Sequence, residues 1–235
     1  MKAVTTTNIA IQDTTRFAYG WLGGGGGRIA FGAFFVDVPH NALDVPVFFT
    51  VIEDNPGETS AEKAIPGEIE FTGSEYHFGP ATFAAGNPVT VGFTFDTRKT
   101  GAGVFRMTSG GWEFIGAERD GSFVSGDTLS GGRYRLGYDK VPPRLRLADP
   151  DEQGFRIVVA DNGSGVDASS VRVSGGPGFM WRFDPERSEV AVTPEAGISL
   201  AGLTVEVIAS DMTGNVAKEK IGRASWRERV EISVG

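Results

Sequence analysis

The chain has 235 residues, a formal net charge of −8 and no cysteine, and it is rich in glycine (34) and phenylalanine (17). The lack of cysteine excludes a disulfide framework and thiolate metal sites, and the acidic balance predicts no nucleic-acid partner. No apolar run reaches the roughly 18 residues of a membrane-spanning helix, so we expect no membrane span. Glycines for tight turns and aromatic residues for the space between sheets indicate an all-β protein.

The first half of the chain reads as a series of short strands. In residues 28–38, apolar side chains first occupy every second position and then become consecutive, which predicts a strand with a bend near Gly32. Further runs, each bounded by Gly, Pro, Asn or Asp, cover 45–53, 73–80, 88–96, 103–108, 111–116, 121–126 and 132–139. This spacing predicts an antiparallel β-sandwich over residues 23–140. Residues 1–22 are expected to be an N-terminal segment, such as the end of a preceding module.

A second β-sandwich is predicted after the adjacent prolines Pro142 and Pro143. Two consecutive prolines force an extended backbone and suit a joint between domains. The strand pattern then restarts at 144–149, 154–161, 169–175, 179–184, 188–194 and 203–211. The fold class is therefore two tandem antiparallel β-sandwich domains, the second over residues 141–220 and lacking, or nearly lacking, its final strand.

The second segment resembles a known family. Residues 142–220 combine the entry prolines with "VVADNGSGVD" and "VEVIASDMTGNVA". These motifs resemble the bacterial immunoglobulin-like modules repeated in secreted and surface proteins. The resemblance implies an immunoglobulin-like sandwich and an extracellular, periplasmic or cell-surface location.

The first segment, residues 23–139, resembles the β-sandwich of ankyrins, netrin receptors and zonula occludens proteins. The matching stretches are "GGGGRIAFGAFFVDVPHNAL", "YHFGPATFAAGNPVTVGFTFD", "WEFIG" and "GRYRLGYD". The step from "GRYRLGYDKVPP" into the second segment also resembles accessory regions of exported peptidases. That resemblance implies a catalytic unit outside this chain.

The end of the chain, "IGRASWRERVEISVG" at 221–235, has three interpretations. Alternation at 230–234 fits a final strand, and the arginines fit a basic tail. The third and favoured interpretation is that "IGRAS", one residue and "RERV" resemble a translated sequencing adapter, whose usual product has Cys in place of Trp226. We therefore expect this tail to be non-native. The native part of this chain would then end near Lys220, and the parent protein would continue beyond that point.

Four oxygen-bearing residues are candidate calcium ligands. In an immunoglobulin-like sandwich, the loop after the second strand and the last hairpin emerge at the same pole. This would place Asp161 and Asp167 near Asp211 and Asn215. Oxygen ligands suit Ca²⁺, but Asp and Asn in turns also commonly accept hydrogen bonds from their own backbone. We expect no other cofactor.

No stretch of the sequence predicts a catalytic site. The glycines at 23–27 precede a strand rather than the helix that a phosphate-binding loop needs. His40 and His77 lie on different elements without ligand-like neighbours, which argues against zinc. No serine stands in a nucleophile elbow, so we expect that the chain is not an enzyme.

Two aromatic sites have a structural and a functional interpretation. Trp112, and the shared face of Phe179, Trp181 and Phe183, could stack on sugars or fill the cores of the sandwiches. We favour burial, because large aromatic side chains dominate core area.

The sequence therefore predicts non-catalytic spacer or docking modules from a larger exported or cell-surface bacterial protein. The expected partners are other domains of that protein and cell-wall or extracellular polysaccharide. One alternative is a carbohydrate or cell-wall binding module, which exposed aromatic residues on one sheet would support. The other is the accessory region of an envelope peptidase.

Overall fold

The computed structural model describes residues 16–54, 69–83, 85–148, 154–176, 178–198 and 203–222. These residues form eighteen strands, all paired antiparallel where paired, and no helix, which confirms the all-β prediction. Accordingly, no helix in the described ranges could cross a membrane. The chain divides into two compact units, residues 1–140 and 141–235, and each is described by itself.

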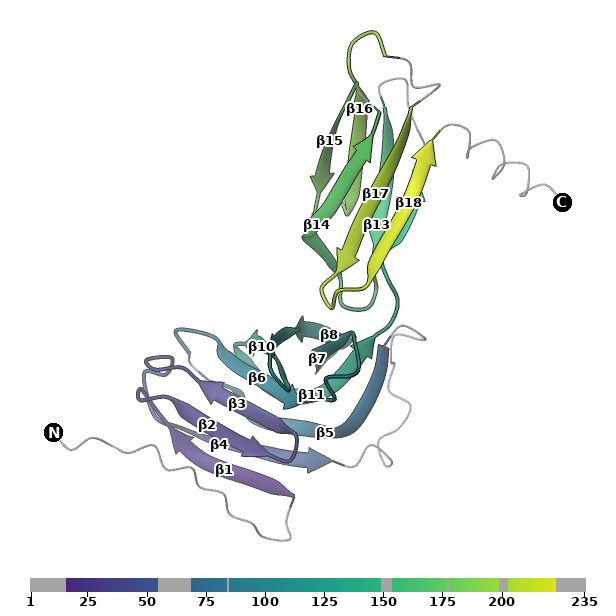
Figure 1. Cartoon of the computed structure of the whole chain (residues 1–235). Coiled ribbons are helices and arrows are strands. Elements are labelled where there is room, and N and C mark those ends of the chain that lie inside the picture. Colours follow the sequence, from purple (N-terminus) through teal and green to yellow (C-terminus); the bar gives the residue numbers. More distant parts are fainter. Residues whose placement is uncertain are drawn as a thin grey trace. The chain divides into compact units, whose positions relative to one another are not determined.

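The first unit has two sheets (Figure 1). In spatial order, the six-stranded sheet contains β1 (Phe17–Leu22), β4 (Val47–Asp54), β5 (Ile69–Thr82), β11 (Ser130–Asp139), β7 (Ala102–Thr108) and β8 (Gly111–Gly116). The five-stranded sheet contains β2 (Gly27–Phe31), β3 (Phe34–Val38), β6 (Val89–Thr94), β10 (Phe123–Thr128) and β9 (Glu118–Asp120). Side chains from both sheets meet in one core, as in a β-sandwich.

The core of the first unit follows from strand alternation. Val89, Val91 and Phe93 are at most 2% exposed and lie in the core, where Phe34 of the neighbouring strand β3 is beside Phe93, whereas Thr94 is exposed. Burying each such side chain contributes about 1.5–3 kcal/mol. The strand predicted at 88–96 is therefore confirmed as β6, and its alternation sets which side is buried.

Two local expectations in this unit were wrong. Residues 28–38 form the hairpin β2–β3 rather than one bent strand, because Gly32 adopts a left-handed φ of 60° that turns the chain back. Residues 17–22 do not precede the module: they form β1, pair with β4 and bury Ala18 in the core. The glycines after β1 lead from one sheet of the module to the other rather than joining two modules.

The second unit also has two sheets (Figure 1). One contains, in order, β12 (Arg144–Leu147), β13 (Phe155–Ala160), β16 (Glu189–Pro194) and β15 (Phe179–Asp184). The other contains β14 (Val166–Gly175), β17 (Thr204–Asp211) and β18 (Val216–Gly222). Their buried aliphatic side chains, such as Ile157, Val190 and Val207, form a single core.

The last strand of the second unit is present, contrary to expectation. β18 pairs with β17 from Val216 opposite Ser210 to Gly222 opposite Thr204, and Ile221 is 3% exposed. The sequence obscured this strand because "VAKEKIG" is mostly charged, as protected edge strands often are. Ile221 and Gly222, assigned to the non-native tail, are part of it. Residues 223–235 lie outside the described residues, and their adapter origin stays a prediction.

Tyr76 links the two sheets of the first unit through its hydroxyl group. This group donates a hydrogen bond to Glu53 Oε1 at 3.0 Å and accepts one from the Ala33 amide at 3.1 Å. Burial raises the pKa of Tyr76 to about 12. Because the folded pKa lies above the unfolded value of about 10, this stabilisation is complete below about pH 10 and is lost toward pH 12.

We expect Tyr76→Phe to lower the free energy of unfolding by about 1–3 kcal/mol at pH 7, because the Ala33 amide loses its acceptor. The difference from the wild type should shrink between about pH 10 and pH 12, since only the wild type loses the Tyr76 contribution there. Urea denaturation across this pH range measures both effects. A difference that stays constant with pH would disprove the linkage.

Candidate functional site

Aromatic side chains cover the outer side of β1 and β4. Alternation puts Phe17, Tyr19 and Trp21 on this side of β1, opposite Ile52, Thr50 and Phe48 of β4. We call Phe17, Tyr19, Trp21, Phe48 and Ile52 the aromatic face. The outer side of a sandwich sheet is ordinarily polar, so this composition is unusual.

The aromatic face is exposed to solvent. Trp21 is 69% exposed, and the other members are 36–45% exposed. Neighbouring rings contact one another, with centroids 5.7 Å apart for Phe17 and Tyr19, 5.6 Å for Tyr19 and Phe48, and 5.3 Å for Trp21 and Phe48. A shallow cavity of about 330 Å³ on this face is lined by Phe17, Tyr19, Phe48, Ile52 and Thr50, and Trp21 lies outside the lining. An exposed apolar patch of this kind marks an interaction site.

Sequence reasoning missed this face because residues 1–22 were assigned to a segment before the module. The alternation of Phe17, Tyr19 and Trp21 is nevertheless visible in "FAYGWL". Period-two alternation predicts a strand, but it does not tell whether the aromatic side faces the core or the solvent.

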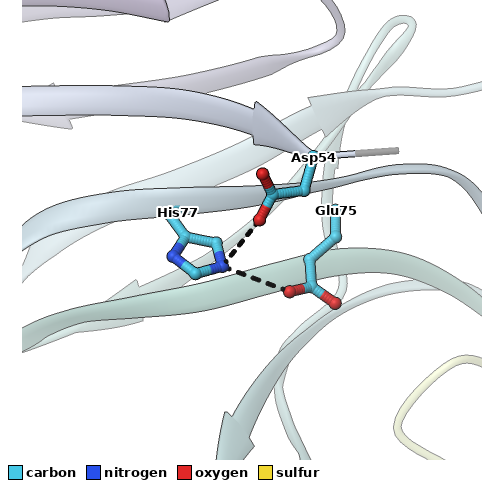
Figure 2. A group of neighbouring side chains, drawn as sticks. All are labelled: Asp54, Glu75 and His77. Atoms are coloured by element: carbon cyan, nitrogen blue, oxygen red, sulfur yellow. Dashed lines mark ion pairs between the residues drawn. The ribbon is translucent and has the colours of Figure 1, made fainter. Parts of the chain in front are cut away.

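Asp54, Glu75 and His77 form a polar cluster (Figure 2). The cluster lies beside the aromatic face, on the same outer side of the sheet, because His77 is opposite Ile52. Glu75 and His77 alternate along β5, and on β4 Asp54 is opposite Glu75 and Ile52 is opposite His77. His77 Nε2 is 3.0 Å from Asp54 Oδ2 and 3.3 Å from Glu75 Oε1.

Burial differs sharply within the polar cluster. The Glu75 side chain is 1% exposed, and Arg133 on the neighbouring strand β11 donates to its two oxygens through Nε and, at 3.1 Å, Nη2. His77 and Asp54 are 44% and 40% exposed. Glu75 is therefore buried and held in place, whereas His77 and Asp54 are accessible to solvent.

The expectation that His77 lacks ligand-like neighbours was wrong. Glu75 is two residues before His77, which was a readable signal, whereas Asp54 reaches His77 only through the pairing of β4 with β5. His40 is exposed and belongs to no such cluster in the described residues.

The four predicted calcium ligands lie in the second unit. The loop after β13 meets the β17–β18 hairpin, and oxygens of Asp161 and Asp211 come within 4.8 Å of one another. Asp167 is opposite Ser210, next to Asp211 in β17, and Asn215 Nδ2 donates to Asp211 Oδ2 at 2.6 Å.

Each of the three carboxylates accepts hydrogen bonds from its own turn. Asp161 Oδ1 accepts from two glycine amides, Asp211 Oδ1 from the amides of Thr213 and Asn215, and Asp167 Oδ1 from the amide and hydroxyl of Ser169. These are the backbone contacts of Asx turns. Calcium binding at this pole stays a prediction.

The two other aromatic sites differ from each other. Trp112 is 7% exposed and packs with Ile69 and Phe105, so its predicted burial is confirmed. Trp181 is 39% exposed, and its predicted burial was wrong. It lies on the edge strand β15, where only one neighbouring strand covers it and where Phe179 and Phe183 are only partly buried.

No protein-family model matches this chain, and no curated protein matches it. The functional assignment therefore depends on the geometry of these sites.

Proposed function

We propose that the chain consists of two non-catalytic β-sandwich modules of a larger exported or cell-surface bacterial protein, and that the first module binds a polysaccharide. The observation that carries this proposal is the exposed aromatic face on β1 and β4. It favours the carbohydrate-binding alternative over a purely structural spacer, because rings that contact one another and are exposed together form an apolar patch of the kind that marks an interaction site.

Stacking on sugars explains the arrangement of these rings. The faces of aromatic rings carry partial negative charge, and the axial C–H groups of a pyranose ring present partial positive charge and apolar surface to them. Phe17, Tyr19 and Trp21 follow one another at every second residue of β1, a spacing of roughly 6.6 Å along the strand. Such a row suits consecutive sugar units of an extended chain.

Charge and cavity size support a neutral polysaccharide. The net charge of −8 disfavours a polyanionic ligand. The cavity of about 330 Å³ lies at the lower end of the roughly 300–1,000 Å³ of small-molecule sites, a size that suits one or two sugar rings. The half-exposed carboxylate of Asp54 and the imidazole of His77 lie beside Ile52 of the aromatic face and can bond sugar hydroxyl groups.

For the second module, we propose an immunoglobulin-like spacer. Its sheet orders, β12-β13-β16-β15 and β14-β17-β18, correspond to the ABED and CFG orders of constant-type immunoglobulin domains. This correspondence supports the immunoglobulin-like part of the proposal. We further propose that the module partners further domains of the same protein. The alternative of an accessory region of an envelope peptidase concerns a catalytic domain outside this chain, and no feature of the described residues favours it.

Retention on polysaccharides tests the proposed function. The full chain is incubated with a panel of neutral polysaccharides, insoluble ones assayed by co-sedimentation and soluble ones by affinity electrophoresis. We expect at least one to retain the wild type and Trp21→Ala to weaken that retention about tenfold, the equivalent of about 1.4 kcal/mol.

Trp181→Ala is the matched control, because it removes an exposed tryptophan from the second unit. Its retention should equal that of the wild type. A panel without any retained polysaccharide, or equal losses in the two tryptophan variants, would refute the proposed function.

A further inference from the structure

We propose that Asp54, Glu75 and His77 form a binding site for a transition-metal ion of the zinc type. This proposal does not rest on polysaccharide binding, although Asp54 and His77 are also placed to bond sugar hydroxyl groups. Its evidence is the geometry of the two carboxylates and the imidazole, and not the rings of the aromatic face.

The spacing of the three donor atoms carries this inference. His77 Nε2 lies 3.0 Å from Asp54 Oδ2 and 3.3 Å from Glu75 Oε1 (Figure 2). Two ligands of a tetrahedral zinc ion, each bonded at about 2.0–2.1 Å, lie about 3.3–3.4 Å apart. The nitrogen-to-oxygen distances are therefore within a few tenths of an ångström of those around a bound ion.

The backbone holds the three ligands in place. Glu75 and His77 project from one side of β5, and Asp54 projects from the directly opposite position on β4. Both strands are interior to the six-stranded sheet. Ligands on paired interior strands are positioned more firmly than ligands on loops.

Arg133 acts as a positioning residue for this site. Its guanidinium binds both oxygens of Glu75, which is 1% exposed, and so fixes the carboxylate on which His77 converges. In metal sites, residues that form hydrogen bonds to the ligands commonly orient them. The guanidinium also offsets one of the two negative charges, so we expect a metal affinity lower than that of a structural zinc site.

The donor set selects the kind of ion. One imidazole nitrogen with two carboxylate oxygens suits Zn²⁺ and similar ions, whereas Ca²⁺ and Mg²⁺ prefer oxygen ligands alone. An ion would bind through the lone pair of His77 Nε2. The partial exposure of His77 and Asp54 gives the ion an entry route and leaves room for water as the fourth ligand.

Zinc titration of the full chain tests this proposal. The chain has only two histidines, so the imidazole C–H signals in proton NMR resolve His77 from His40. We expect saturable binding of one Zn²⁺ in competition with a chromophoric chelator, with the His77 signals shifting and the His40 signals unchanged. His77→Ala and Asp54→Asn should each weaken binding at least tenfold.

His40→Ala is the matched control, since it removes the other exposed imidazole, and it should bind zinc as the wild type does. Asp54→Asn replaces a surface carboxylate with an amide of the same shape, so the folded state survives and circular dichroism verifies it. His77 signals that do not move with excess zinc, or an unchanged affinity in Asp54→Asn, would overturn the proposal.

Discussion

Replacing Arg133 with alanine is expected to lower the free energy of unfolding of the first unit by about 3–5 kcal/mol. Arg133 binds both carboxylate oxygens of Glu75, whose side chain is 1% exposed. Without the guanidinium, the carboxylate stays buried while its strongest hydrogen-bond donor is gone, which is the costly way to break an ion pair. Urea denaturation followed by tryptophan fluorescence, to which buried Trp112 of this unit contributes, measures the effect.

Lys140→Ala provides the matched control for this prediction. Lys140 follows β11 directly and pairs with Glu70 of β5, the strand that carries Glu75, but the two side chains are 61% and 51% exposed. An exposed pair contributes about 0–1 kcal/mol. If Lys140→Ala and Arg133→Ala destabilised the unit equally, burial of Glu75 would not be the cause.

Gly101→Ala is expected to destabilise the first unit by about 2–5 kcal/mol. Gly101 has a φ of 76°, which costs an alanine about 1–2 kcal/mol. A Cβ atom there would lie 1.9 Å from the backbone oxygen of Asp139, so the backbone must shift, and overpacking of this kind adds about 1–3 kcal/mol. Urea denaturation again provides the measurement.

Gly73→Ala separates these two costs. Gly73 has nearly the same φ, 72°, but no atom lies within 4 Å of the added Cβ. We expect this variant to lose only the conformational part, about 1–2 kcal/mol. Equal effects at the two glycines would show that the close approach to Asp139 costs nothing.

The parts of the fold that the sequence predicted are those with one buried side and clear turn residues. Val89, Val91 and Phe93 alternate with polar residues, and the strand bounds and buried side both follow from that pattern. Turn geometry was less readable: Gly32 reverses the chain completely, although a bend and a reversal have the same sequence signature.

The candidate sites were harder to predict, for two physical reasons. Alternation did not identify the exposed side of β1, because an aromatic row has the same sequence pattern whether it faces the core or the solvent. It did not identify β18 either, because the charged residues of this strand hide the alternation of apolar and polar residues. The polar cluster depends on which residue of β4 lies opposite Glu75. That register is set by strand pairing and not by local sequence.

Two acidic residues of the second unit, unlike the aromatic face and the polar cluster, were placed together correctly from the sequence. The predicted proximity of Asp161 to Asp211 follows from sandwich connectivity, and the structure brings these two residues together. Each carboxylate accepts hydrogen bonds from amides of the glycine-containing turn directly after it. Such a turn can be recognised from the local sequence.

The most direct measurement is the dissociation constant of the full chain for a polysaccharide retained in the panel. It is determined for the wild type, for Trp21→Ala and for the double variant Tyr19→Ala/Trp21→Ala. If the aromatic face holds consecutive sugars, the dissociation constant should rise about tenfold with each ring removed. One value shared by all three proteins would mean that the sugars bind elsewhere and would contradict the proposed function.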